Sequence, residues 1–170
     1  PLPFMALMPA AVEKLLGIYL TARIALDFFS LTAGMKLLIM TVGAATILLA
    51  VMMALIQKDF KRLLSYHAVS QVGYMILGIG TGTAIGVVGG LFHLLNNAIY
   101  KTGLFLTAGA VEKQTGTTDL KRLGGLRKRM PVTFGFFIIA ACSIAGVPPF
   151  NGFVSKELIF EATLKSGQAV

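Results

Sequence analysis

Six apolar stretches follow one another along the chain, separated by short segments rich in charge, glycine or proline. They cover residues 9–29, 35–57, 63–80, 84–111, 131–145 and 150–165. Residues 37–57 carry no charge over about the twenty residues that a helix needs to cross a bilayer. Because the stretches are long and do not alternate, they favour helices over the strands of a membrane barrel. The pattern predicts an all-α, polytopic membrane protein with about six transmembrane helices.

The composition agrees with a membrane protein. Hydrophobic residues make up 56% of the 170 residues, charged residues only 13%, and the mean hydropathy is +0.81. A soluble domain carries about 25% charged residues. The single cysteine, Cys142, excludes an internal disulfide and a CxxC metal or cluster framework. Since the first residue is a proline within apolar sequence, we expect residues 1–170 to be one partial membrane domain of a longer protein.

The net charge of +8 has two interpretations, a nucleic-acid partner or the topology signal of a membrane protein. No basic tract is interleaved with aromatic residues, so we expect no nucleic acid. Ten of the fifteen Lys and Arg residues lie between or after alternate stretches: Lys58, Lys61, Arg62, Lys113, Lys121, Arg122, Arg127, Lys128, Arg129 and Lys165. The intervening turns 30–34 and 80–83 hold none. We therefore expect all these basic segments on one side of the membrane, the cytoplasmic side by the positive-inside rule.

Prolines and glycines predict two local features. Pro148 and Pro149 cannot continue the helix of residues 131–145, so the chain breaks there, and carbonyls near Val147 or Pro148 should lack helical partners close to Lys156. Gly82, Gly86 and Gly90 recur every four residues. Such a stripe lets a neighbouring helix approach closely, and a flexible hinge is the alternative.

A polar stripe runs through the apolar segment "GGLFHLLNNAIYKTGLF", residues 89–105. His93, Asn97 and Lys101 are spaced by four and share one helix face. Ionisable groups at membrane depth cost about 2.5–3.5 kcal/mol each on insertion scales, so they normally face a polar interior. Lysine and histidine can both exchange protons there, and the Asn97 amide can hold a water between them. The alternative is a polar cluster that only locks helices together.

Two more lysines are candidates. Lys14 lies beside Glu13 at the start of the first stretch, where an interfacial helix start is an equal alternative. Lys156, followed by Glu157, lies just after the "GVPPFNGF" break. A broken helix exposes backbone groups and admits water at depth, which favours an ion or proton site at Lys156.

Taken together, the segments resemble a known family. The chain is similar to the antiporter-like membrane subunits of respiratory complex I, of energy-converting membrane-bound hydrogenases and of Mrp cation/proton antiporters. The resemblance rests on "AAVEKLLGIYLTARI", "QKDFKRLLSYHAVSQVGYMILGIG", "GGLFHLLNNAIYKTGLFLTAGAVE", "DLKRLGGLRKRMP" and "SIAGVPPFNGFVSKELI", in this order. It implies a larger bundle of two inverted repeats, each with a broken helix, so that one break is expected near each end of this chain.

The resemblance also implies roles for residues. Lys14 resembles the lysine of the first broken helix, Lys101 the central lysine of the second repeat, and Lys156 the lysine of the second broken helix. His93 resembles the histidine that precedes the central lysine. Asn97 stands where several relatives have a second histidine, and Glu13 stands where an apolar residue is expected. The glutamate that usually partners the first lysine belongs to a segment upstream of this chain.

Three functions follow as hypotheses. The first is a proton-translocating subunit of an energy-converting redox complex, a non-redox subunit that binds no flavin, haem, cluster or metal and works beside other membrane subunits and a peripheral redox arm. The second is a cation/proton antiporter subunit without redox coupling, and the third is a structural membrane module. In each case the expected location is the bilayer of a bacterial or archaeal cytoplasmic membrane. The site residues expected for proton movement are Lys14, His93, Lys101 and Lys156, supported by Asn97, Glu13 and Glu157.

Overall fold

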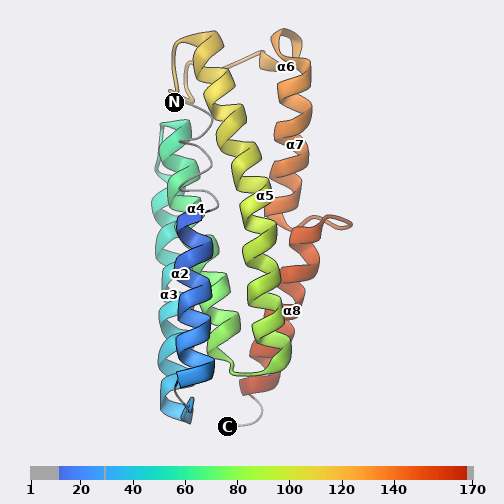
Figure 1. Cartoon of the computed structure of the whole chain (residues 1–170). Coiled ribbons are helices and arrows are strands. Elements are labelled where there is room, and N and C mark those ends of the chain that lie inside the picture. Colours follow the sequence, from blue (N-terminus) through green and yellow to red (C-terminus); the bar gives the residue numbers. More distant parts are fainter. Residues whose placement is uncertain (1–11, 29, 168–170) are drawn as a thin grey trace.

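The computed structural model describes residues 12–28 and 30–167, and the regular elements in these ranges are all helices (Figure 1). They are α2 (Glu13–Arg23), the π-helical segment η2 (Ile24–Phe28), α3 (Ala33–Leu55), α4 (Phe60–Gly80), α5 (Ala84–Thr115), the short α6 (Leu126–Arg129), α7 (Pro131–Ala145) and α8 (Asn151–Gly167). The all-α class is therefore confirmed. The first helix break expected from the sequence falls on residues 1–11 and lies outside the described residues.

Local chemistry explains where the long helices begin and end. The side chains of Thr32, Asp59 and Thr83 accept from the third backbone N–H after them, which caps the N-termini of α3, α4 and α5. Gly116 and Gly146 end α5 and α7 with φ of 71° and 83°, in the left-handed region where glycine has no steric penalty. These caps divide the chain at nearly the boundaries that the hydrophobic pattern predicts.

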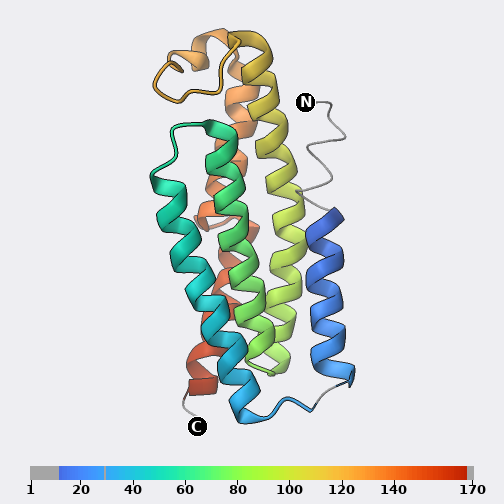
Figure 2. The same cartoon turned by 90° about the vertical axis from the view of Figure 1, so that its left-hand side faces the viewer.

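Helix α5 is the centre of the bundle. It contacts α2, α4, α7 and α8, while α3 packs along the far side of α4 (Figure 2). Ile18 of α2 joins Met75 and Ile79 of α4 and Leu94 of α5 in one buried cluster. Side chains on α5 are therefore enclosed from several directions, which places the polar stripe of this helix in the interior.

Glycines bring neighbouring helices unusually close. A Cβ on Gly73 would lie 2.7 Å from the Gly43 carbonyl oxygen, and one on Gly90 would lie 3.0 Å from the Met75 carbonyl oxygen. The close approach expected for Gly86 and Gly90 is thus confirmed against α4. Gly82 has a different role, because it lies in the turn before α5 with φ of 61°.

Helices α7 and α8 lie end to end along α5. Gly103, in the second half of α5, faces Ala140 of α7, and Gly89, in the first half, faces Ile159 of α8. Their 15 and 17 residues together match the 32 residues of α5, and Figure 1 shows α8 continuing in the direction of α7. The expectation that residues 150–165 return to the basic side, with Lys165, is therefore wrong. The Ser166 hydroxyl instead approaches Met40 near the start of α3, at the opposite end.

The two basic connections, one between α3 and α4 and the other between α5 and α6, meet at the same end of the bundle. The sequence predicted that these two would lie on one side. The Phe60 amide donates to the Thr118 carbonyl and the Leu120 amide to the Lys58 carbonyl, both over 2.9 Å. The Thr118 hydroxyl donates to the Asp59 carboxylate, which also accepts from the Arg62 amide. These hydrogen bonds hold the pKa of Asp59 below its ordinary value of 3.8.

Only α3 is both long enough and apolar enough, among the described helices, to be recognised as a membrane span by length and hydropathy. Helices α4 and α5, with 21 and 32 residues, have the length, but they carry the buried polar groups. Helices α7 and α8 are each shorter than about 20 residues, the length that crosses a bilayer alone.

Candidate functional site

The three stripe residues of α5 are buried side by side on its inner face. His93, Asn97 and Lys101 expose 0%, 1% and 0% of their surface. The Lys101 ammonium donates to the Leu64 carbonyl oxygen of α4 over 2.8 Å. None of the ion pairs among the described residues includes Lys101. The sequence thus predicted the shared face correctly, and the structure adds that a main-chain carbonyl, rather than a carboxylate, receives the lysine.

His93 connects three helices through its two ring nitrogens. Nδ1 lies 2.8 Å from the Ser155 hydroxyl of α8, and Nε2 lies 3.0 Å from the Gln71 amide oxygen of α4. The Tyr100 hydroxyl donates to the same Gln71 oxygen over 3.3 Å and lies 3.5 Å from His93 Nε2. The result is a buried polar network at the meeting point of α4, α5 and α8.

The geometry lets His93 change its proton content without moving its ring. The Gln71 oxygen can only accept, so Nε2 carries a hydrogen in both states of the ring. Nδ1 can accept from the Ser155 hydroxyl when the ring is neutral, or donate to it when the ring is charged. Ser155 has a second acceptor, the Gly152 carbonyl at 3.2 Å, toward which it can turn its hydrogen in the second case.

Between Lys101 and His93 the hydrogen-bond network has a gap. Neither polar atom of the Asn97 amide, nor Nδ1 of His67 on α4, has a hydrogen-bond partner among the residues that the structure describes. Buried polar groups are normally satisfied by protein or by ordered water. His67 also lies within electrostatic range of Lys101 and Lys156. The Asn97 amide and the His67 ring are therefore the kind of polar groups that a bridging water satisfies.

Lys156 closes the break between α7 and α8. Its ammonium donates to the carbonyls of Ile144 over 2.7 Å and of Ala145 over 3.3 Å, and lies 5.3 Å from the centre of the Tyr74 ring. The sequence placed the free carbonyls near Val147 or Pro148, which is a few residues too late. The Val147 carbonyl accepts from the Phe150 amide over 2.9 Å because the chain turns there.

An amide pair ties this break to α5. The Asn151 side-chain amide donates to the Asn96 side-chain oxygen over 2.8 Å, and the Asn96 side-chain amide donates to the main-chain carbonyl of Asn151 over 3.2 Å. Ser143, near the end of α7, donates to the Asn151 side chain over 2.5 Å. The first residue of α8 is therefore held against both α5 and α7, which sets the position of Lys156.

The remaining predicted residues divide into two kinds. Lys14 is partly buried on α2, one turn before the buried Ile18, and it lies within electrostatic range of Lys101. Glu13 and Glu157 are exposed, and neither forms an ion pair with a described residue. Lys14 thus lies on the side of Lys101 and the other buried polar residues, whereas both glutamates lie outside this buried group.

Several members of the site were not predicted from the sequence. His67, Gln71 and Tyr74 recur at spacings of four and three in "SYHAVSQVGY", the same signal that marked the stripe on α5. Ser155 and Asn96 carry no such signal, since each is a single polar residue beside one already noted. Their roles depend on which helices meet, and this is a property of the tertiary structure.

A helical bundle with an apolar exterior and a buried line of lysine, histidine and amide groups is the architecture of an integral membrane subunit. The chain belongs to the NADH:quinone oxidoreductase/Mrp antiporter transmembrane family, whose family model matches residues 1–170. It is accordingly an integral membrane protein of a family found in bacterial and archaeal membrane complexes. The family resemblance predicted from the sequence is confirmed.

The chain is similar to individual members of this family in sequence and in fold. It is 41% identical to a Na(+)/H(+) antiporter subunit of Alkalihalophilus pseudofirmus over 95% of this chain and 35% of that protein. Its fold matches a chain of the Mrp complex from Dietzia sp. DQ12-45-1b with a TM-score of 0.93 at 36% identity, covering 98% of this chain and 31% of that one. It also matches a chain of the membrane-bound sulfane sulfur reductase, an archaeal respiratory membrane complex, with a TM-score of 0.87 at 37% identity. That match covers 96% of this chain and 34% of the other. The chain thus spans about a third of the length of these relatives.

Proposed function

We propose that this chain is the proton-conducting segment of a cation/proton antiporter subunit that exchanges Na⁺ or K⁺ for H⁺. The main observation behind this proposal is the buried row of Lys101, Asn97 and His93 on α5. The hydrogen bond between His93 and Ser155 joins this row to α8, the helix that carries Lys156. The identity to a subunit of a Na(+)/H(+) antiporter and the match to the Mrp complex favour antiport over redox coupling. In this proposal Lys14, Lys101, His93 and Lys156 carry the protons, and Asn97 supports them.

The proposed path follows the contacts in order. Lys101 releases a proton from its ammonium, and water beside Asn97 and His67 carries it across about 12 Å of helix, at 1.5 Å per residue, to Nδ1 of His93. As Nδ1 gains the proton, the Ser155 hydroxyl turns from Nδ1 to the Gly152 carbonyl. Lys156 continues the path toward the α7–α8 break. Lys14 supplies a second positive group whose charge state influences that of Lys101.

Five crossings of the membrane fit this function better than six. We propose that α2 with η2, α3, α4 and α5 each cross once and that α7 and α8 form one crossing with a break in its middle. The break then lies at depth, beside Lys156 and the amides of Asn96 and Asn151. The rest of the parent protein, together with other membrane subunits, is proposed to cover the apolar outer faces of the helices.

Replacing Lys101 in the intact parent complex tests the function. Lys101→Ala should reduce ion-coupled proton transport in reconstituted vesicles by about a hundredfold, since a proton-transfer group typically contributes 10²–10⁴-fold. Lys101→Arg should fail equally, because guanidinium keeps its proton. Lys128→Ala, a loss of charge on the exposed α6, is the matched control. If Lys101→Arg transports at the wild-type rate, the stripe only holds helices together, as in a structural module.

A second candidate function is proton translocation in a redox complex. The match to a respiratory membrane complex supports it, and it would add a peripheral redox arm to the partners. The two functions differ in what drives transport. An antiporter moves protons in vesicles when only a Na⁺ or K⁺ gradient is applied, whereas the redox-coupled subunit requires an electron donor and acceptor for its complex.

A further inference from the structure

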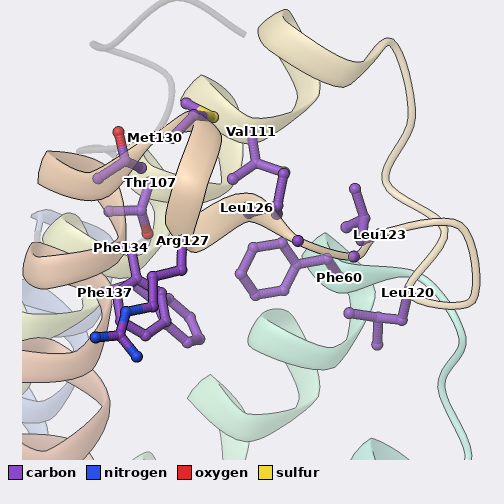
Figure 3. A pocket seen from close by; sticks show the side chains of 13 residues that line it. Phe60, Thr107, Val111, Leu120, Leu123, Leu126, Arg127, Met130, Phe134 and Phe137 are labelled. Atoms are coloured by element: carbon purple, nitrogen blue, oxygen red, sulfur yellow. The ribbon is translucent and has the colours of Figure 1, made fainter.

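An apolar cavity of about 370 Å³ lies at the end of the bundle where the basic connections meet (Figure 3). Phe60 of α4, Val111 of α5 and Phe134 and Phe137 of α7 form its walls, and Leu123 comes from the connection before α6. The rings of Phe60 and Phe137 meet edge to face with centroids 5.7 Å apart. The cavity is therefore built from four separate parts of the chain and is not a crevice along one helix.

Few polar groups line this cavity. Among its described lining residues only Thr107, Thr133 and Arg127 have polar side chains. The Thr107 hydroxyl donates to the Leu104 carbonyl of its own helix over 2.8 Å, so it has no hydrogen left for an acceptor on a ligand. A water-soluble metabolite would lose its hydration here without new hydrogen bonds, which is costly. The walls instead suit a hydrocarbon chain.

Positive charge surrounds the mouth of the cavity. The Arg127 guanidinium lies 5.9 Å from the centre of the Phe134 ring, a cation–π arrangement that places it beside the apolar wall. Four further basic residues are exposed in the same segment: Lys121, Arg122, Lys128 and Arg129. The acidic residue that approaches them is Asp119, whose contact with Arg122 is loose at 3.8 Å. The charge at the mouth therefore complements an anion.

We propose that the cavity binds an anionic phospholipid, with one acyl chain between Phe60, Val111 and Phe137 and the phosphate at Arg127. Three observations combine in this assignment: an apolar cavity, an arginine at its rim, and a position at the end of membrane-embedded helices. Basic pockets at this depth bind anionic lipid headgroups through the same combination. The lipid would fix α6 and its flanking connection against α5 and α7. The proposal is independent of the ion that the protein carries.

Native mass spectrometry of the purified full-length parent tests the proposal. Dioleoyl phosphatidylglycerol is titrated against dioleoyl phosphatidylcholine, and we expect one phosphatidylglycerol to bind in preference. Arg127→Gln should weaken that binding about fivefold, the factor expected from about 1 kcal/mol per basic residue near a lipid surface. Arg129→Gln removes the same charge from the same short helix but does not line the cavity, so it loses only salt-screened long-range attraction and should weaken binding less than about twofold.

A second pair of variants tests the acyl-chain position. Val111→Phe fills the cavity and should abolish the preferred site, while Val132→Phe, at an exposed position of α7 outside the cavity, should not. If Val111→Phe does not assemble, the comparison of Arg127→Gln with Arg129→Gln still tests the proposal. Equal binding by Arg127→Gln and Arg129→Gln overturns the proposal. So does a structure of the parent in phosphatidylglycerol nanodiscs in which a protein helix or a quinone fills the cavity.

Discussion

At the scale of residues, the site combines a strong hydrogen-bond network with a gap. His93 is bonded through both ring nitrogens, to Gln71 and Ser155, whereas the Asn97 amide has no partner among the described residues. A fully bonded histidine holds its orientation, and an amide without a protein partner keeps its donors and its acceptor for water. A proton path needs both properties, because fixed donors define the route and water carries the proton across the gap.

Replacing Gln71 by Leu should weaken both the network and transport. The change leaves His93 Nε2 and the Tyr100 hydroxyl without their shared acceptor, and each unsatisfied buried group costs about 1–3 kcal/mol. We expect transport to fall on the order of tenfold, as for a lost hydrogen bond of about 1.4 kcal/mol to the reacting group. Gln57→Leu is the control, since the Gln57 side chain, just after α3, bonds among the described residues only to the Met53 carbonyl. Transport in vesicles and thermal unfolding of the parent measure the two effects, and equal transport by both variants would remove Gln71 from the path.

The sequence could predict only part of this site. Helical periodicity alone places His93, Asn97 and Lys101 on one face, because residues four apart are neighbours on any helix. The same spacing marks a second stripe, His67 and Gln71, on the neighbouring helix α4. Periodicity could not show that these two stripes face each other, or that Ser155 arrives from a third helix. Those facts depend on which helices pack together, and they required the structure.

At the scale of elements, close packing of α3 on α4 depends on two glycines. Gly73→Ala should destabilise the parent by about 1–3 kcal/mol, the usual cost of overpacking. The added Cβ would lie 2.7 Å from the Gly43 carbonyl oxygen, and a backbone atom in a packed helix cannot move aside cheaply. Gly109→Ala on α5 is the control, because its Cβ would meet no described atom within 4 Å and alanine favours helix by about 0.5–1 kcal/mol. Thermal unfolding measures both, and similar stabilities would contradict the close packing.

Asp59 joins two connections and caps α4, so its effect should depend on pH. Asp59→Ala should cost about 0.5–2 kcal/mol at neutral pH, as expected for a lost N-cap. Hydrogen bonds from Thr118 and the Arg62 amide lower the pKa of Asp59 in the folded state. Its stabilisation is therefore complete above its ordinary value of 3.8 and is lost as the pH falls through the lower folded value. The difference in melting temperature between wild type and variant should shrink in that acid range. Asp27→Ala, which removes an exposed ion pair with Arg23, should change little at any pH.

The lengths of α7 and α8 argue against two separate membrane crossings. Residues 131–145 form 15 residues of helix, about 22 Å at 1.5 Å per residue, which is less than the roughly 30 Å of a bilayer core. The hydrophobic pattern marked both segments as apolar and the prolines marked the break, so each looked like a separate crossing. Whether two short helices stack or lie side by side depends on their contacts with α5, which the local pattern does not contain.

At the scale of the whole molecule, the bundle has an apolar exterior around a polar centre. Leu37, Leu48 and Leu49 of α3 and Val132 and Phe136 of α7 are among its most exposed side chains. Water would disfavour such a surface, whereas lipid and neighbouring membrane helices match it. Lys101 and His93 are fully buried within this bundle. This arrangement, with apolar side chains outside and polar groups inside, suits an integral membrane protein.

The number of crossings can be measured directly by cysteine labelling. With α7 and α8 stacked end to end, Lys165 lies at the same end as Ala84, and Lys58 and Lys121 lie at the other end. In a parent lacking other cysteines, with Cys142→Ser, we expect Lys165→Cys and Ala84→Cys to react with an impermeant maleimide from one face of the membrane. Lys58→Cys and Lys121→Cys should react only from the opposite face, since their connections are bonded to each other. Because six separate crossings would return Lys165 to the basic side, labelling of Lys165→Cys together with Lys58→Cys would refute the stacked arrangement and, with it, the position of Lys156 at membrane depth.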